Sequence, residues 1–175
     1  MNPILRCCFA ALLAIAGLSC SRETSVQEGP HAETGKMAWG RDFKSALAAS
    51  RRSGKPIFAL FQEVPGCNGC KRFGREVLSD PLIVQGIENE FTPLLIHNNS
   101  PGPDAKVLQQ YGETPWSYQV VRFLDAEGRD LIPRKDHVWE AGPLAERMIA
   151  ALEKAGRPVP EYLRKAVVGK RVPVE

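Results

Sequence analysis

A short apolar run that ends just before a pair of cysteines constrains the fold of this chain more than any other feature of its sequence. Residues 57–61 read IFALF, with Pro56 before them and a Pro-Gly loop at 65–66 after them. A continuous apolar run of this length between two breakers is typical of a strand that is buried on both faces. Because such a strand needs helices over both faces of its sheet, the run predicts an α/β fold.

Helix and strand patterns alternate along the rest of the chain. Apolar residues at helical spacing, together with caps such as Asp80-Pro81, predict five helices. These are expected over 39–53, from the cysteines to about residue 77, over 81–90, in a short segment that ends near Gly112, and over 143–156. Strands are predicted over 91–96 and 120–124, and the latter turns through 125–128 into a partner strand over 130–132. Residues 158–160 are expected to add one more turn. This order predicts a central mixed sheet flanked by helices.

The composition is that of one ordinary globular domain. The 175 residues are 43% hydrophobic and 25% charged, which argues against wholesale disorder. The 23 basic and 20 acidic residues leave a formal charge of only +3, and the sequence contains no long basic run. This balance argues against a nucleic-acid partner.

The first residues have the pattern of a secretory signal peptide. Arg6 supplies a positive charge, and residues 7–18 form an apolar stretch far shorter than the roughly 20 residues that span a bilayer. The ending Gly17-Leu18-Ser19-Cys20 resembles a bacterial lipoprotein signal, in which the cysteine is lipidated and becomes the new amino terminus. Cleavage nearby without lipidation is the alternative. Both outcomes predict an extracytoplasmic, periplasm-facing protein, in which disulfides persist.

These patterns predict four segments. Residues 1–19 form the signal peptide, and residues 20–36, which are nearly devoid of apolar side chains, form a flexible tether to the membrane. Residues 37–157 form the folded domain, and residues 158–175 form a C-terminal extension.

Cys67 and Cys70 carry the strongest chemical signal in the sequence. Two residues separate them, and they lie just after the buried strand, where a helix is expected to begin. The free N–H groups and partial positive charge of a helix N-terminus favour the thiolate, the reactive form, at Cys67. Cys70 lies one turn later, close enough to resolve a mixed disulfide. We therefore expect a redox-active Cys67–Cys70 disulfide, with no further cofactor and no metal.

Two structural interpretations of the cysteine pair are weaker. A structural disulfide closing so short a loop would contribute only roughly 2 kcal/mol. A closed zinc site needs four ligands, and His31, His97 and His137 show no ligand spacing around the pair. Copper(I) transfer by a metallochaperone and non-catalytic client binding stay open as alternative functions.

With these motifs in place, residues 37–155 resemble the thioredoxin superfamily, particularly its secreted members. The matching features are Gly54-Lys55-Pro56, the buried strand, the Cys67-Asn68-Gly69-Cys70 motif preceded by Val64-Pro65-Gly66, and the turn at 123–128. The resemblance implies a three-layer thioredoxin-like fold. It also implies thiol–disulfide exchange with protein clients and a separate redox partner that recycles the cysteines.

The sequence departs from the family at the proline that helps to bind clients. That cis-proline is expected near Gln119, but the local proline is Pro115. If Pro115 replaces it, its peptide bond should be cis and should contact Cys67. Pro115, Trp116 and Gln119 are therefore the candidate client-binding residues.

A second departure concerns proton transfer. Thioredoxins carry a buried acidic residue on the active-site strand, and Phe61 stands at the matching position. Glu63 lies two residues later and is the candidate for proton transfer; a solvated loop carboxylate is the alternative interpretation. His97 is expected to end a strand parallel to the first one, and His137 and Trp139 are interpreted as packing or surface groups.

Overall fold

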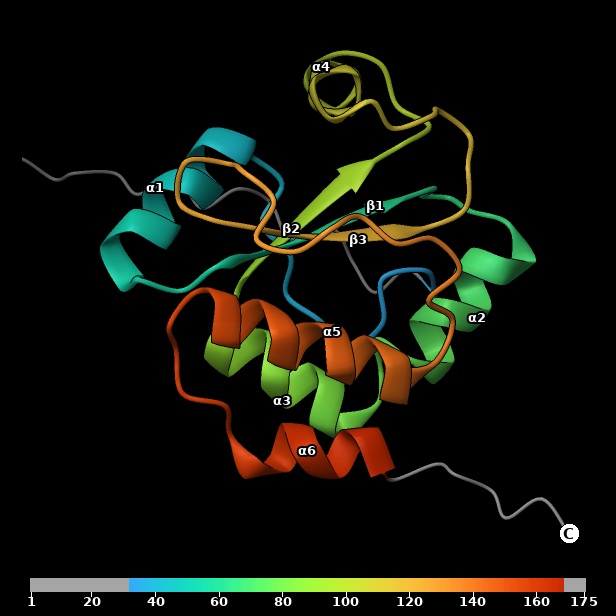
Figure 1. The fold of residues 1–175 in the computed structure, drawn as a ribbon. Coiled ribbons are helices and arrows are strands. Elements are labelled where there is room, and N and C mark those ends of the chain that lie inside the picture. The colour runs from blue at the N-terminus through green and yellow to red at the C-terminus, as the bar shows by residue number, and fades with distance from the viewer. Residues whose placement is uncertain (1–31, 169–175) are drawn as a thin grey trace, which may run out of the picture.

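A three-stranded mixed sheet forms the centre of the protein (Figure 1). The computed structural model describes residues 32–168. The strand order is β2 (Thr92–His97), β1 (Ile57–Gln62) and β3 (Val120–Leu124), with β2 parallel and β3 antiparallel to β1. His97 ends β2 directly beside Gln62 at the end of β1, as the sequence predicts. This arrangement confirms the mixed sheet.

Helices cover both faces of the sheet. One face carries α1 (Phe43–Ser53) and α4 (Pro103–Tyr111), and α2 (Asn68–Glu76), α3 (Pro81–Glu90), α5 (Ala141–Lys154) and α6 (Glu161–Val168) lie toward the other. In Figure 1 the sheet is seen between these two layers. The three-layer α/β fold predicted from the sequence is therefore confirmed.

The central strand explains why both layers are needed. Every residue of β1 is buried, and its side chains alternate between two cores. Phe58 packs with Phe91 and Phe123, with ring centroids 5.4 to 6.1 Å apart, on the side of α3 and α5. Phe61 belongs to the second core, with residues of α1 and α4. Aromatic rings at these spacings add to the free energy gained from burial.

The first predicted helix begins four residues later than its sequence pattern suggests. Gly40 forms a β-bridge with Leu94 on β2, the edge strand of the sheet. Its N–H donates to the Pro93 carbonyl over 3.1 Å. The helix starts only after Asp42, whose carboxylate accepts a hydrogen bond from the Ser45 N–H. Pairing with the sheet therefore overrides the helical spacing of residues 39–42.

The partner strand predicted over 130–132 is reduced to one bridge, between Leu124 and Asp130. The Leu131 N–H donates to the Phe123 carbonyl over 2.8 Å, but the pairing ends there. Pro133 follows and has no N–H with which to continue the ladder.

The ordered fold extends beyond the predicted domain at its N-terminal end. Residues 32–36 form a turn in which Glu33 and Thr34 are buried, although the sequence predicts a flexible tether up to residue 36. The predicted signal peptide, Cys20 and the rest of the tether lie outside the described residues. Within residues 32–168, no helix has both the length and the apolarity to cross a membrane.

The C-terminal segment forms a full helix rather than the single turn predicted from its prolines. In α6, Leu163 and Ala166 are buried against the core shared with α3 and α5. Gly86 on α3 makes room for this contact, because a Cβ atom there would come within 2.6 Å of Leu163 Cδ2. At least as far as residue 168, the segment named an extension is therefore part of the domain.

Leu163→Ala should lower the free energy of unfolding by about 2 to 5 kcal/mol, because it leaves a cavity between α3, α5 and α6. Val168→Ala removes apolar atoms from the exposed end of the same helix and should change it by less than about 0.5 kcal/mol. Equilibrium denaturation of both variants measures the difference. Equal effects would mean that α6 contributes no packing to the domain.

Candidate redox site

The end of β1 delivers the chain directly into the cysteine pair. A loop over 63–66, with a cis peptide bond between Val64 and Pro65, connects β1 to α2. Cys67 is the N-cap residue of α2, with an extended backbone (φ −69°, ψ 173°), so it lies one position before the first helical turn in which the sequence analysis expected it. At this position the sulfur still faces the unpaired N–H groups of the helix N-terminus.

The two thiols have opposite environments. Their Sγ atoms lie 3.4 Å apart, with Cys67 exposed and Cys70 fully buried. The backbone N–H of Cys70 stabilises the Cys67 thiolate and holds the pKa of Cys67 below its ordinary value. Burial raises the pKa of Cys70 to about 12. At neutral pH the exposed thiol is therefore the more readily ionised of the two, and the buried thiol is protonated.

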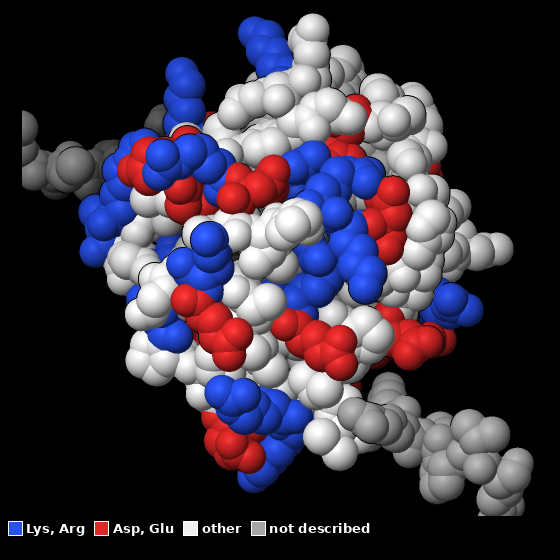
Figure 2. Space-filling view, in the orientation of Figure 1, with Lys and Arg blue, Asp and Glu red and all other residues white. Residues whose placement is uncertain are grey.

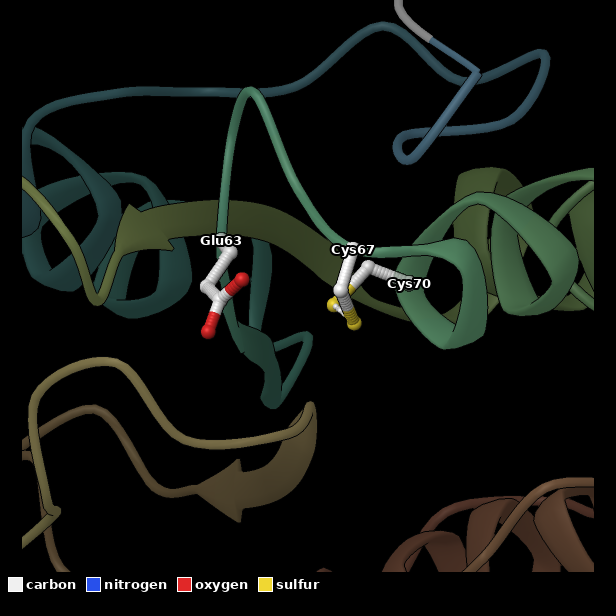
Figure 3. A group of neighbouring side chains, drawn as sticks. All are labelled: Glu63, Cys67 and Cys70. Atoms are coloured by element: carbon white, nitrogen blue, oxygen red, sulfur yellow. Dashed lines mark hydrogen bonds between the residues drawn. The ribbon is translucent and has the colours of Figure 1, made fainter.

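Glu63 lies beside both sulfurs. Its carboxylate and the two sulfur atoms are all within 4.8 Å of one another, and the three side chains point to the same side of the loop (Figure 3). The negative charge of Glu63 acts to raise the pKa of both thiols. These three residues are also the one group among residues 32–168 with three side chains placed to hold a metal ion.

Two asparagines after β2 connect the cysteine loop to the loop predicted to bind clients. Asn99 accepts a hydrogen bond from the Val64 N–H at Oδ1 (3.2 Å) and donates from Nδ2 to the Pro65 carbonyl (3.1 Å). Asn98 donates from its backbone N–H to the Gln62 carbonyl (3.0 Å) and from Nδ2 to the Ser117 carbonyl (2.6 Å). The Asn98 carbonyl accepts from the Trp116 N–H (3.1 Å). Three loops far apart in sequence are thus held side by side at one edge of the sheet, the edge at which open α/β sheets bind ligands.

Ion pairs hold Glu113, which lies just before the residues predicted to bind clients. Glu113 is buried and accepts hydrogen bonds from Arg122 on β3 (2.6 Å) and from Arg134 (2.8 and 2.9 Å). Arg122 also pairs with Asp130. Figure 2 shows basic side chains lying beside acidic ones on the face of the molecule that it draws. Paired charges of this kind hold the Glu113 side chain against β3.

Pro115 does not replace the cis-proline of the thioredoxins. Within residues 32–168 the one cis peptide bond precedes Pro65, so the bond before Pro115 is trans and that expectation is wrong. Pro115 and Trp116 are exposed and line a hollow with Asn98 and Pro101. The reason is local: Trp116 adopts a left-handed backbone (φ 57°) and donates to the Asn98 carbonyl, which turns this part of the loop outward.

Gln119 occupies the position where the family proline was expected. It is buried, and neither atom of its side-chain amide has a hydrogen-bond partner among the described residues. Buried amides without partners are costly unless water or a ligand binds them.

Two residues at the site were not predicted to belong to it. Glu33, which the sequence analysis assigns to the tether, accepts a hydrogen bond from the N–H of Gly66, directly before Cys67. The Trp139 ring and the Cys67 sulfur both border Gly69, at 3.6 and 3.7 Å from where its Cβ would lie. The position of Trp139, an aromatic residue before the last predicted helix, only weakly indicates that it belongs to the site. No local sequence pattern indicates this for Glu33.

The alkylation rate of the reduced protein should follow the ionisation of Cys67, because its pKa is lowered and that of Cys70 is raised. A thiol with a pKa of about 12 is ionised in roughly one molecule in 10⁵ at pH 7. Cys70→Ser should therefore keep the wild-type alkylation rate near neutral pH, and Cys67→Ser should lower it by at least about a hundredfold. Glu63→Gln removes a negative charge that raises the pKa of Cys67, so its alkylation profile should move to lower pH. Rates measured across pH with a soluble alkylating reagent test this, and rapid alkylation at Cys70 would contradict it.

Comparisons with known proteins identify the family and support the fold. The sequence model of a thioredoxin-like family matches residues 38–126. A solved structure described as DsbH oxidoreductase is similar with a TM-score of 0.57 at 18% sequence identity, over 73% of this chain and 92% of that one. Comparison with curated proteins gives no match. The family match spans half of the sequence and the structural likeness supports the same fold, so the chain belongs to the thioredoxin-like family.

Proposed function

We propose that this protein is a thiol–disulfide oxidoreductase that exchanges disulfides with protein clients. The observation that carries the proposal is the contrast within the cysteine pair. One thiol is exposed with a lowered pKa, and the other is buried 3.4 Å away with a pKa raised to about 12. A structural disulfide needs no such contrast, whereas a nucleophile and a resolving thiol need it.

The first step of the exchange is an attack by Cys67. Its thiolate forms a bond to one sulfur of a client disulfide, and the other client sulfur leaves as a thiolate. The product is a mixed disulfide between Cys67 and the client. Cys70 stays out of this step because its thiol is buried and protonated.

The second step is resolution by Cys70. Its thiol loses a proton and attacks the sulfur of Cys67, which releases the client as a dithiol and leaves a Cys67–Cys70 disulfide. Two electrons pass from the protein to the client, and a separate redox partner must reduce the pair again. We propose that the Glu63 carboxylate accepts the Cys70 proton, because it lies within 4.8 Å of both sulfurs. The same steps in reverse oxidise a client dithiol.

The client is proposed to contact the loop beside the cysteines. Trp116 is 71% exposed, and Pro115 stands next to it over the hollow with Asn98. A large exposed aromatic ring near a reactive thiol is suited to hold an apolar client side chain. The amide of Gln119 is buried, so it is not proposed to contact the client.

We further propose that the protein works outside the cytoplasm, attached to a bacterial membrane through a lipid on Cys20. The sequence pattern of residues 1–20 is the support for this location. The 13 residues from Cys20 to Glu33 can span at most roughly 45 Å. A lipid at Cys20 would therefore keep the thiols close to the membrane and to clients at its surface.

Cys70→Ser should trap clients as covalent mixed disulfides, because the thiol that resolves them is absent. Cys67→Ser should abolish both trapping and exchange. Glu63→Gln, which keeps both thiols, should accumulate more mixed disulfide than the wild-type protein if the carboxylate takes up the Cys70 proton. Non-reducing electrophoresis and mass spectrometry of cells expressing each variant measure the trapped species.

The double variant Cys67→Ser/Cys70→Ser is the matched control for this experiment, since it lacks both thiols of the pair. Trapping by Cys67→Ser alone would reverse the two roles. A reduced protein that traps no client but binds copper(I) through both cysteines would instead favour the metallochaperone function. The cluster of Glu63, Cys67 and Cys70 is the observation behind that second candidate.

Mass spectrometry of the mature protein should find an amino terminus at a lipidated Cys20. Cys20→Ala should abolish the lipid and release the protein from the membrane fraction, because Cys20 is the proposed attachment residue. Cys8→Ala, in the proposed signal peptide, is the matched control and should leave the mature mass unchanged. An unmodified amino terminus at another residue would rule out the lipid anchor.

A further inference from the structure

The turn formed by residues 32–36 packs directly on α2 and the segment after it. The Gly74 backbone lies so close to this turn that a Cβ atom there would come within 1.9 Å of the Ala32 carbonyl oxygen. At Gly35, which has a φ of 66°, a Cβ would come within 2.4 Å of the Leu78 carbonyl oxygen. Two glycines therefore make this close packing of backbone on backbone possible.

Within this turn, Glu33 bridges the two ends of the cysteine loop. Its side chain is buried, and Oε1 accepts a hydrogen bond from the Gly66 N–H over 2.8 Å. Its backbone carbonyl accepts a hydrogen bond from the side-chain amide of Gln62, the last residue of β1. Both the residue before the loop and the residue before Cys67 are thus tied to Glu33.

The Glu33 side chain also approaches the buried cysteine. A Cβ atom at Gly66 would lie 3.0 Å from Glu33 Cγ and 2.9 Å from Cys70 Cβ. The two side chains therefore border the same small space under the loop. Glu33 therefore holds the backbone at Gly66, directly before Cys67, and it does so beside the Cys70 side chain.

We propose that Glu33 is a positioning residue of the redox site, and that the turn 32–36 is part of that site. A hydrogen bond from a backbone N–H to a buried carboxylate is among the stronger ones in proteins. By fixing Gly66, it holds the Cys67 and Cys70 sulfurs near each other and raises their effective concentration for disulfide formation. This inference rests on the proposed redox function for its purpose, but its geometry does not depend on any client.

Glu33→Ala should lower the equilibrium constant for forming the Cys67–Cys70 disulfide by about tenfold. For this two-electron couple, that is a midpoint potential about 30 mV more oxidising. Glu33→Gln keeps an oxygen that can accept from the Gly66 N–H, so its constant should stay within about threefold of wild type. Glu33→Asp shortens the side chain and should shift the constant in the same direction as Glu33→Ala. Equilibration of the full-length protein in glutathione buffers measures all three constants.

Glu76→Ala is the matched control. It removes an exposed carboxylate of α2 that pairs with Arg72 at 4.0 Å, and it should leave the constant unchanged. The proposal is overturned if Glu33→Ala and Glu33→Asp, folded by circular dichroism, both stay within twofold of wild type. It is also overturned if Glu33→Gln matches Glu33→Ala.

This experiment separates the inference from the proposed function. The couple is measured without any client, so a shift in Glu33→Ala supports the positioning role even if the Cys70→Ser variant traps nothing. Conversely, client trapping with no shift in Glu33→Ala would support the oxidoreductase and overturn the role of Glu33.

Discussion

Burial of β1 on both faces is the constraint on which the rest of the structure depends. Each residue of this strand is at most 1% exposed, so helices must cover the sheet above and below. The strand can then emerge from the core only at its ends. Its carboxyl end lies beside the carboxyl end of the parallel strand β2, and both lead into loops at one edge of the sheet. The cysteines and the asparagines that hold their loop meet there because β1 and β2 run in the same direction.

The chemical contrast between the two thiols follows from their positions on one helix. Cys67 is the N-cap residue of α2, where the backbone N–H groups are unpaired and solvent is near. Cys70 lies one turn further, on the face with Phe73 that packs into the core. The spacing of two residues thus puts one sulfur at a favourable place for an anion and the other at an unfavourable one. The backbone N–H of Cys70 lowers the pKa of Cys67, and burial in the core raises the pKa of Cys70.

Local patterns were enough to predict most of the fold. The limits of α3 and β3 agree with the sequence because a cap with a following proline, and a short apolar run before a turn, act over neighbouring residues only. The failures share a different origin. Residues 39–42 are not helical because Gly40 pairs with residues more than fifty positions away. Pro115 precedes an outward turn that is held by Asn98. Glu33 lay in a segment without apolar residues, and its burial depends on the absence of side chains at Gly66 and Gly74, which no local pattern reveals.

The loops around the cysteines are tied by a different set of contacts from the one that the family resemblance implied. The expected proline position is taken by Gln119 and the expected acidic position by Phe61, whose side chain belongs to the opposite core, with α1 and α4. In their place, Asn98 and Asn99 connect the cysteine loop to residues 115–117, and Glu33 connects it to the N-terminal turn. All of these bonds involve backbone groups, so they fix the course of the chain rather than a single side chain. A site built in this way keeps its geometry while exposed side chains such as Trp116 vary, and so the residues that hold the thiols are separate from those proposed to meet the client.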